Sequence, residues 1–242
     1  MIWAILSDVH GNLEALQAVL EDCRREEARR FLFLGDAVGY GANPNECLGL
    51  LKKASDLQVA GNHDYGAVGL TDISYFNPSA RAAIEWTAKI LTEESRDFLR
   101  RLALVRQDGE VTLVHSALPR PEEWDYILTA DDAEESFQEF PGKALFIGHS
   151  HRPLIVDRDR KGRLRTRGPE EIKIEEGRQY LINPGSVGQP RDHNPMAAYG
   201  LYDATLGKCR LKRVAYDIET AQEKILEAGL PPSLARRLSY GQ

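Results

Sequence analysis

The stretch IWAILSDVHGNLEALQAVLEDC, residues 2–23, places an apolar run, a polar turn and a helical pattern in immediate succession. The run Ile2–Leu6 is short and apolar, as in a buried strand, and the turn SDVHGN, residues 7–12, ends it. Leucine, alanine and valine then recur near helical spacing, and Asn12 is a suitable N-cap. This order predicts a layered α/β fold with polar side chains placed just after its strands.

The same order of buried strand, polar turn and helix recurs along the chain. The strand predicted over 31–34 ends at Gly35-Asp36 and precedes a helix over 44–53, and the strand over 57–60 ends at GNHD, residues 61–64. Asn77-Pro78 begins a helix that is expected to run to about residue 91, and another is expected over 93–102. A hairpin turns at Asp108-Gly109, strands dominate from residue 144 to residue 214, and helical patterns return over 218–226 and 233–238.

Length and charge restrict the class of protein. The 242 residues suit one large α/β domain, so we predict a single domain over 1–242 with C-terminal helices at about 217–240. The formal net charge of −6 lacks the basic surplus of a general nucleic-acid binder, which disfavours nucleic acid as a partner. No run resembles a secretory signal or a membrane span, and no CxxC pair is present. We therefore expect a soluble cytoplasmic protein without a membrane partner.

Five of the six histidines end or follow a predicted buried strand. In layered α/β folds, ligand sites gather at the carboxyl ends of strands. Residues two apart in extended chain point the same way, so Asp8 and His10 are expected to face one point, as are His149 and His151. The pattern predicts that seven nitrogen and oxygen donors converge: Asp8, His10, Asp36, Asn62, His115, His149 and His151.

Seven donors exceed what one tetrahedral metal uses and suit two adjacent ions that share a carboxylate. The absence of cysteine from the set favours Mn, Fe, Zn, Co or Ni. A lone histidine on a strand is more often structural, and a lone Gly-Asp is usually a turn. Four such motifs in this order, each ending a strand, favour the metal site instead. His193 falls outside the set and is expected on the surface or at the rim of the pocket.

The motifs resemble those of the calcineurin-like metallophosphoesterase superfamily. They are SDVHGN (7–12), GDAVGYG (35–41), GNHD (61–64), VHSA (114–117) and GHSHRP (148–153), and NPGSVGQPRD (183–192) is similar to a group of small bacterial phosphodiesterases within it. The resemblance implies a four-layer α/β/β/α sandwich with a two-metal site. It implies that Asp8, His10 and His151 hold the first metal, that Asn62, His115 and His149 hold the second, and that Asp36 bridges them.

The resemblance also implies that His63 stands beside the metals as an acid or a phosphate ligand, oriented by Asp64. Protein serine/threonine phosphatases and symmetric dinucleoside tetraphosphatases carry GDxVDRG, whereas Gly39 and Tyr40 occupy the Asp and Arg positions here. The phosphate-gripping arginine of those enzymes is therefore missing at this position. Scaffold members of another branch have Cys at the position of His63, so the histidine favours an intact active site.

Together these features predict a dinuclear metal-dependent phosphoesterase, most simply a phosphodiesterase. It would hydrolyse a small nucleotide-like or other organic phosphate through a metal-bridging hydroxide, and His63 would protonate the leaving group. A non-catalytic metal-binding scaffold and a metal-dependent nuclease remain alternatives, and the helices after residue 217 are compatible with a homo-oligomer. The candidates for substrate binding lie in or after motif loops. For each of them, an ordinary surface or core position is the alternative. They are Arg152, Arg191, Tyr40, Tyr65, Tyr75 and Phe76.

Overall fold

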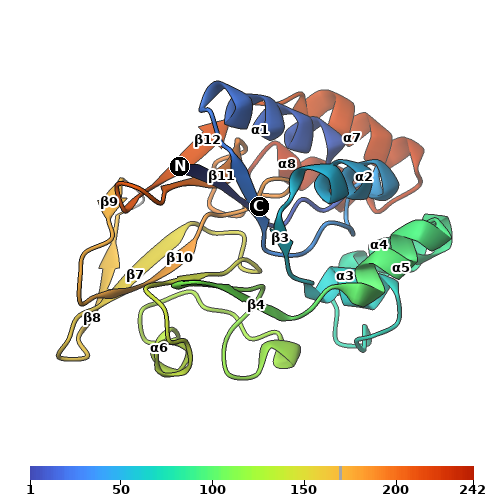
Figure 1. Ribbon diagram of the computed structural model, residues 1–242. Coiled ribbons are helices and arrows are strands. Elements are labelled where there is room, and N and C mark those ends of the chain that lie inside the picture. Colours follow the sequence, from blue (N-terminus) through green and yellow to red (C-terminus); the bar gives the residue numbers. More distant parts are fainter. Residues whose placement is uncertain (169–170) are drawn as a thin grey trace.

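The computed structural model describes residues 1–168 and 171–242, which form two facing β-sheets with helices outside them (Figure 1). The strands are β1 (Ile2–Leu6), β2 (Arg30–Phe33), β3 (Leu57–Gln58), β4 (Val105–Asp108), β5 (Val111–Val114), β6 (Ala144–Phe146), β7 (Leu154–Arg158), β8 (Leu164–Arg167), β9 (Ile172–Lys173), β10 (Gln179–Asn183), β11 (Ala197–Asp203) and β12 (Lys208–Val214). In the described residues, one six-stranded sheet has the order β3-β2-β1-β11-β12-β9 and the other the order β4-β5-β6-β10-β7-β8.

Helices cover the outer faces of both sheets, which gives the expected α/β/β/α sandwich. In the view of Figure 1, α1, α2, α7 and α8 lie above the first sheet and α6 lies below the second. None of the helices in the described ranges combines the length and apolar character needed to cross a membrane. The helices are α1 (Leu13–Arg25), α2 (Pro44–Ala54), α3 (Asn62–Ala67), α4 (Pro78–Ile90), α5 (Glu93–Arg101), the short 3₁₀ helix η1 (Pro121–Glu123), α6 (Glu134–Glu139), α7 (Ile218–Glu227) and α8 (Pro232–Leu238).

The alternation of side chains along β1 explains how the layers are joined. Leu6 packs with the helices above the first sheet, whereas Ile5 packs between the two sheets with residues such as Phe146. Successive strand residues point to opposite faces, so a fully apolar β1 serves both layers at once. Helix α1 buries Leu16 and Val19 against this sheet, and the side chain of Asn12 caps the helix by accepting a hydrogen bond from the Ala15 N–H at 3.1 Å.

The predicted helices and the hairpin β4–β5 are confirmed with boundaries close to those expected. Four elements of the described residues were not predicted: α3, η1, α6 and β9. The GNHD segment was expected to be a loop, because Gly, Asn and Asp are common turn residues. Instead Asn62 begins α3, because the Asp64 carboxylate accepts a hydrogen bond from the Gly61 N–H at 3.0 Å and so caps the first turn.

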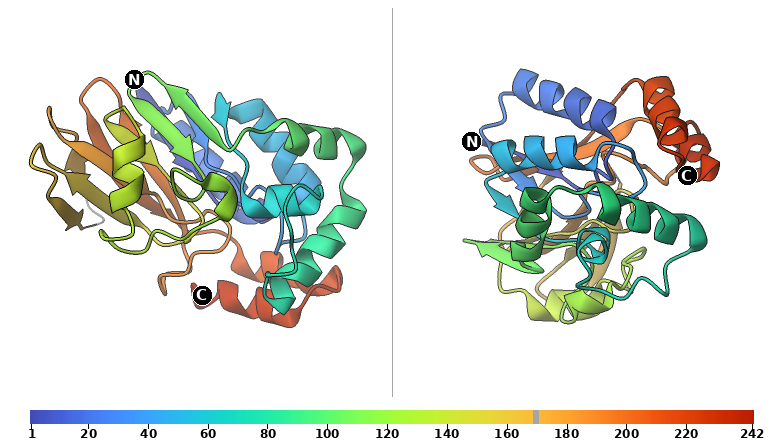
Figure 2. Two further views of the ribbon diagram at one scale, coloured as in Figure 1. Left: turned by 90° about the horizontal axis from the view of Figure 1, so that it is seen from below. Right: turned by 90° about the vertical axis from the view of Figure 1, so that its right-hand side faces the viewer.

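The C-terminal helices pack over the same edge of the molecule as α4 (Figure 2). Leu234 and Leu238 of α8 form an apolar cluster with Ala80 and Ala83 of α4. Tyr40, which comes from the loop after β2, belongs to the same cluster. The end of the chain therefore lies against the loops that follow the first strands.

Candidate metal centre

The loops after β1, β2, β5 and β6 converge because these strands run parallel in pairs. β1 pairs with β2, and β5 pairs with β6, so each pair delivers its carboxyl ends to one edge. Main-chain hydrogen bonds then join the loops: the Asp8 N–H donates to Gly35 O at 3.0 Å, and the Gly148 N–H donates to His115 O at 2.9 Å. Loops that are far apart in sequence are thereby held in fixed positions relative to one another.

Two groups of donor atoms form at this edge, and Asp36 belongs to both. Within each group all donor atoms lie within 4.8 Å of one another. Asn62 is also buried, and its Oδ1 has no hydrogen-bond partner in the described residues. All seven predicted donors are at most 7% exposed. The first group is Asp8, His10, Asp36 and His151, and the second is Asp36, His115 and His149.

The backbone of these loops departs from the extended conformation that the alternation argument assumed. Asp8 and His10 have φ angles of 53° and 51°, and His149 and His151 have φ angles of 67° and 57°. Side chains other than glycine rarely adopt this left-handed region, and it tends to occur at functional sites. The expectation that His149 and His151 face one point is wrong, because each lies in a different group.

Each of the four clustered histidines uses one ring nitrogen to donate to a main-chain carbonyl. A carbonyl can only accept, so the proton of the neutral ring lies on the bonded nitrogen and the other nitrogen presents its lone pair. Histidines that bind metals are commonly held in this way. The pairs are His10 Nδ1 with Val38 O at 2.9 Å, His115 Nδ1 with Leu34 O at 2.7 Å, His149 Nε2 with Trp124 O at 2.7 Å, and His151 Nδ1 with Gln189 O at 2.6 Å.

The inward nitrogens lack suitable partners among the described residues. The Nε2 atoms of His10 and His151 are 3.0 Å apart, although both are lone-pair acceptors in these tautomers. His115 Nε2 also has no hydrogen-bond partner in the described residues; it lies 3.3 Å from Asp36 Oδ2. Burial lowers the pKa of His115, but Asp36 and Asp8 outweigh burial and raise it to about 9, so a metal bound here would have to displace the proton of this ring. Facing lone pairs repel one another, and a cation between them would remove the repulsion. The donor set therefore fits bound metal, with nitrogen and oxygen ligands and no thiolate.

The two buried carboxylates differ in their acidity. Burial, partly offset by the nearby His115, raises the pKa of Asp8 to about 7. Burial acts on Asp36 in the same direction, but His115 and His63 outweigh it and hold the pKa of Asp36 below its usual range. His115 thus supplies the positive charge that keeps Asp36 ionised, and divalent cations would do the same for Asp8.

Asp64 does not orient the His63 ring as expected. Its carboxylate accepts hydrogen bonds from the main-chain N–H groups of Asp36 at 2.8 Å, Ala37 at 2.9 Å and Gly61 at 3.0 Å. These bonds join Asp64 to the loop after β2 and to the start of α3, and the described residues show no hydrogen bond between Asp64 and the His63 ring. Asp64 therefore positions the backbone beneath Asp36 and His63.

The His63 ring lies between the first ligand group and aromatic side chains. Its centre is 4.8 Å from the His10 ring, 4.4 Å from the Tyr40 ring and 5.1 Å from the Phe76 ring. Its Nδ1 is buried without a hydrogen-bond partner in the described part of the chain. Burial lowers the pKa of His63 to about 4, although Asp36 opposes the shift. The ring is neutral at pH 7 and keeps one N–H donor.

A cavity of about 620 Å³ opens over His63, Asn62 and His149. Trp124 and Tyr126 line it and were missed in the sequence, because the loop after β5 has no periodic pattern to mark them. The Tyr126 ring stacks on His149 with centres 4.0 Å apart and an interplanar angle of 11°. The ligand group therefore lies at the bottom of a pocket with aromatic walls.

The candidates for substrate binding are placed differently from one another. Tyr40, Tyr75 and Phe76 line the cavity, whereas Tyr65 donates its hydroxyl to Leu102 O at 2.8 Å. The side chain of Arg191 donates to the Tyr40 hydroxyl at 3.3 Å, and its main-chain N–H donates to His151 O at 3.2 Å. Arg152 is exposed and donates to Arg191 O at 3.1 Å. The side chain of His193 is exposed, in line with the expectation for it.

The fold and the buried ligand set are those of a metallophosphoesterase. The family model described as the calcineurin-like phosphoesterase superfamily domain matches residues 1–205. The chain belongs to this superfamily, as the motifs predicted, and it is therefore classed among the phosphoric ester hydrolases. The matched range ends before α7 and α8.

Relatives of similar length support the assignment. The uncharacterized protein MJ0912 of Methanocaldococcus jannaschii is 42% identical over 243 residues, covering 99% of this chain and 98% of that protein. A metallophosphoesterase from Sphaerobacter thermophilus superposes with a TM-score of 0.89 at 38% identity, covering 100% of this chain and 99% of the other. The hypothetical protein PH1004 from Pyrococcus horikoshii OT3 has a TM-score of 0.76 at 22% identity over 100% and 98% of the chains, and so shares the fold.

Proposed function

We propose that the chain is a dinuclear metal-dependent phosphodiesterase acting on a small nucleotide-like or other organic phosphate. The observation that carries the proposal is the membership of Asp36 in both ligand groups. One carboxylate shared by two sets of histidines suits two adjacent cations better than a single one. Mn, Fe, Zn, Co and Ni are the candidate metals, since the donors are imidazole and carboxylate.

The proposed ligands divide between the two positions. When bound, two such cations would lower the pKa of a water and neutralise the phosphate oxygens. The carbonyls that accept from the histidine rings aim the four inward nitrogens at the proposed cation positions, and a bound cation would displace the second proton of His115. We assign Asp8, His10 and His151 to the first position, Asn62, His115 and His149 to the second, and Asp36 to both.

His63 is proposed to act on the leaving oxygen of the ester. Its ring lines the cavity directly beside the first ligand group, 4.8 Å from the His10 ring between centres. Because the ring is neutral near pH 7, it would donate a hydrogen bond from its remaining N–H and pass the proton as the bond breaks. Asp64 serves as a positioning residue through the main-chain bonds described above.

The aromatic side chains that line the cavity favour a substrate that carries a planar group. Trp124, Tyr126, Tyr75 and Phe76 line the cavity above His149 and His63. The Tyr75 side chain is 90% exposed, so its ring is available to a ligand at the mouth of the cavity. A nucleobase or a similar flat group would gain stacking energy of about 1–3 kcal/mol on such a ring.

We further propose that residues 1–242 form a single domain that includes the C-terminal helices. Ala221 and Ile225 of α7 pack with Tyr40 and the α4 side chains in one apolar cluster. Lys224 of α7 also pairs with Glu14 of α1. The helices therefore share a core with the rest of the chain. The observed packing supports one cooperative unit.

The direct test is hydrolysis of bis-p-nitrophenyl phosphate by protein loaded with each candidate metal in turn. We expect turnover with at least Mn²⁺, and a fall of about 100-fold or more for His63→Ala. Arg101→Met, a substitution on the distant helix α5, is the control. No turnover with any metal would favour the scaffold alternative, and faster cleavage of oligonucleotides than of small diesters would favour a nuclease.

A further inference from the structure

Two arginines from distant segments lie against the Tyr40 ring. The guanidinium carbon of Arg191 is 5.6 Å from the ring centre, and that of Arg237 in α8 is 5.9 Å from it. The same ring lies 4.6 Å from the His10 ring and 4.4 Å from the His63 ring between centres. Both cationic groups are thus one aromatic ring away from the candidate metal centre.

Neither of these guanidinium groups has a carboxylate counter-charge in the part of the chain that the structure describes. Across residues 1–168 and 171–242, no carboxylate lies within ion-pairing distance of Arg191 or Arg237. Several other partly buried arginines are paired, as Arg178 is with Asp157 and Arg213 is with Asp192. The chain therefore leaves a concentration of positive charge at this one edge of the site.

This arrangement is unfavourable for the empty protein. Both arginine side chains are only partly exposed, and charged groups lose hydration when they are buried. Burial and the charge of Arg191 together lower the pKa of Arg237. An anion between or beside the two guanidinium groups would offset both costs, because arginine binds phosphate through a rigid fork of N–H donors.

Space for such an anion exists beside α8. A cavity of about 470 Å³ is lined by Arg237, Arg236, Tyr240, Ser79 and Ser233. Arg191 lies outside this lining, on the Tyr40 ring that both arginines contact. Asn77 lines both this cavity and the one over the metal ligands. The two cavities are therefore neighbours on the surface of the protein.

We infer that Arg191 and Arg237 form an anion subsite for a second phosphate group of the substrate, separate from the phosphate that is cleaved. This inference rests on the proposed function, which it narrows to phosphodiesters that also carry a terminal phosphate. Arg237 comes from α8, beyond the 1–205 range of the family match. Helix α8 would thus supply one of the two arginines of the subsite, and Arg191 lies within the matched range.

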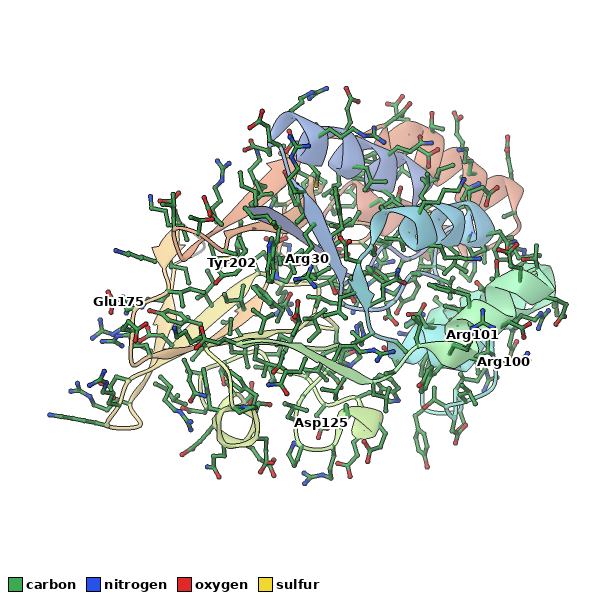
Figure 3. The ribbon with its side chains drawn as sticks, viewed as in Figure 1. Arg30, Arg100, Arg101, Asp125, Glu175 and Tyr202 are labelled. Carbon is green, nitrogen blue, oxygen red and sulfur yellow. The ribbon has the colours of Figure 1, made fainter. Side chains whose placement is uncertain are left out.

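Two ligands that differ by one phosphate test the inference without any need for turnover. Thymidine 5′-monophosphate and thymidine 3′,5′-bisphosphate are titrated into Mn²⁺-loaded protein by calorimetry. We expect the wild type to bind the bisphosphate at least 10-fold more tightly, and Arg237→Met to bring the affinity ratio close to one. Arg101 is exposed on α5 (Figure 3), so the control variant Arg101→Met should keep the full preference for the bisphosphate.

A lysine variant separates charge from packing. Arg237→Lys keeps the positive charge but loses the planar group against Tyr40, so it should recover most of the preference if an anion is bound there. Thermal unfolding of each variant checks that it is folded. A wild type that fails to bind the bisphosphate or shows no preference for it, or an Arg237→Met variant that keeps the preference, would overturn the subsite. The bis-p-nitrophenyl phosphate assay reports on the proposed function separately.

Discussion

His10 and His151 direct their Nε2 atoms at each other across 3.0 Å, while the Nδ1 of each ring donates to a main-chain carbonyl. With the proton of each neutral ring on Nδ1, neither Nε2 can donate to the other. Burial lowers the pKa of both histidines well below their usual value, so protonation does not relieve the contact near pH 7. A cation bound between the two nitrogens would account for the contact.

Metal loading should therefore raise thermal stability. A ligand present at 100 times its Kd adds about 2.7 kcal/mol per site. For a chain of this size, 1 kcal/mol shifts Tm by roughly 2–4 °C. With two sites filled, we expect Mn²⁺ to raise Tm by about 10–20 °C relative to chelator-treated protein, measured by scanning calorimetry, and a chelator to reverse the gain. An unchanged Tm with all five candidate metals would count against the ligand assignment.

Gly61→Ala should damage the metal centre without removing a ligand. A Cβ at this position would overlap the Asp36 carboxylate, so the shared ligand must shift. Disturbing a group that orients a ligand typically lowers metal affinity 10–100-fold, and we expect about this loss in a metal titration. Gly49→Ala on α2 is the matched control, because nothing lies within 4 Å of its added Cβ. Equal affinities for the two variants would contradict the prediction.

The pH dependence of activity should distinguish a neutral His63 from an imidazolium acid. Burial lowers the pKa of His63 to about 4, so the ring loses its second proton well below neutral pH. An essential imidazolium would make kcat/KM fall above about pH 5. We expect no such fall between pH 6 and 8 in the rate profile of the wild type. A descending limb in that range that His63→Ala abolishes would show that the ring is charged when it acts.

The cysteines should be unreactive in the folded protein. Cys23, Cys47 and Cys209 are free and buried. Burial raises the pKa of Cys23 and of Cys209 to about 12 and that of Cys47 well above its usual value. At pH 8 all three stay as thiols, which do not attack a disulfide reagent. We expect no reaction of the folded protein with such a reagent in buffer, and reaction of all three cysteines in guanidinium. Rapid labelling of the folded protein would show that the cysteines are accessible.

Local sequence signals predicted most of the fold and all the donors in the two ligand groups. The apolar run Ile2–Leu6 and the turn after it form β1 and its ligand loop, because a buried strand must end where polar residues begin. The alternation argument placed Asp8 and His10 together correctly but for the wrong reason. Both adopt left-handed backbone, which main-chain bonds between distant loops impose and no local pattern reveals.

The residues around the ligands were harder to predict because their positions depend on tertiary packing. Trp124 and Tyr126 reach the cavity from an irregular loop. Arg237 was expected only as part of a helical pattern, and nothing in that pattern indicates that α8 would bring it to Tyr40. Asp64 lies beside His63 in sequence, yet the N–H groups of the neighbouring loop determine its contacts.

The sharing of Asp36 between two ligand groups is tested most directly by anomalous diffraction from crystals of the Mn²⁺-loaded protein. We predict two anomalous peaks roughly 3.5–4 Å apart, with the Asp36 carboxylate between them, since dinuclear phosphoesterase centres have this spacing. One peak, or two peaks bound by other side chains, would contradict a dinuclear centre built on Asp36.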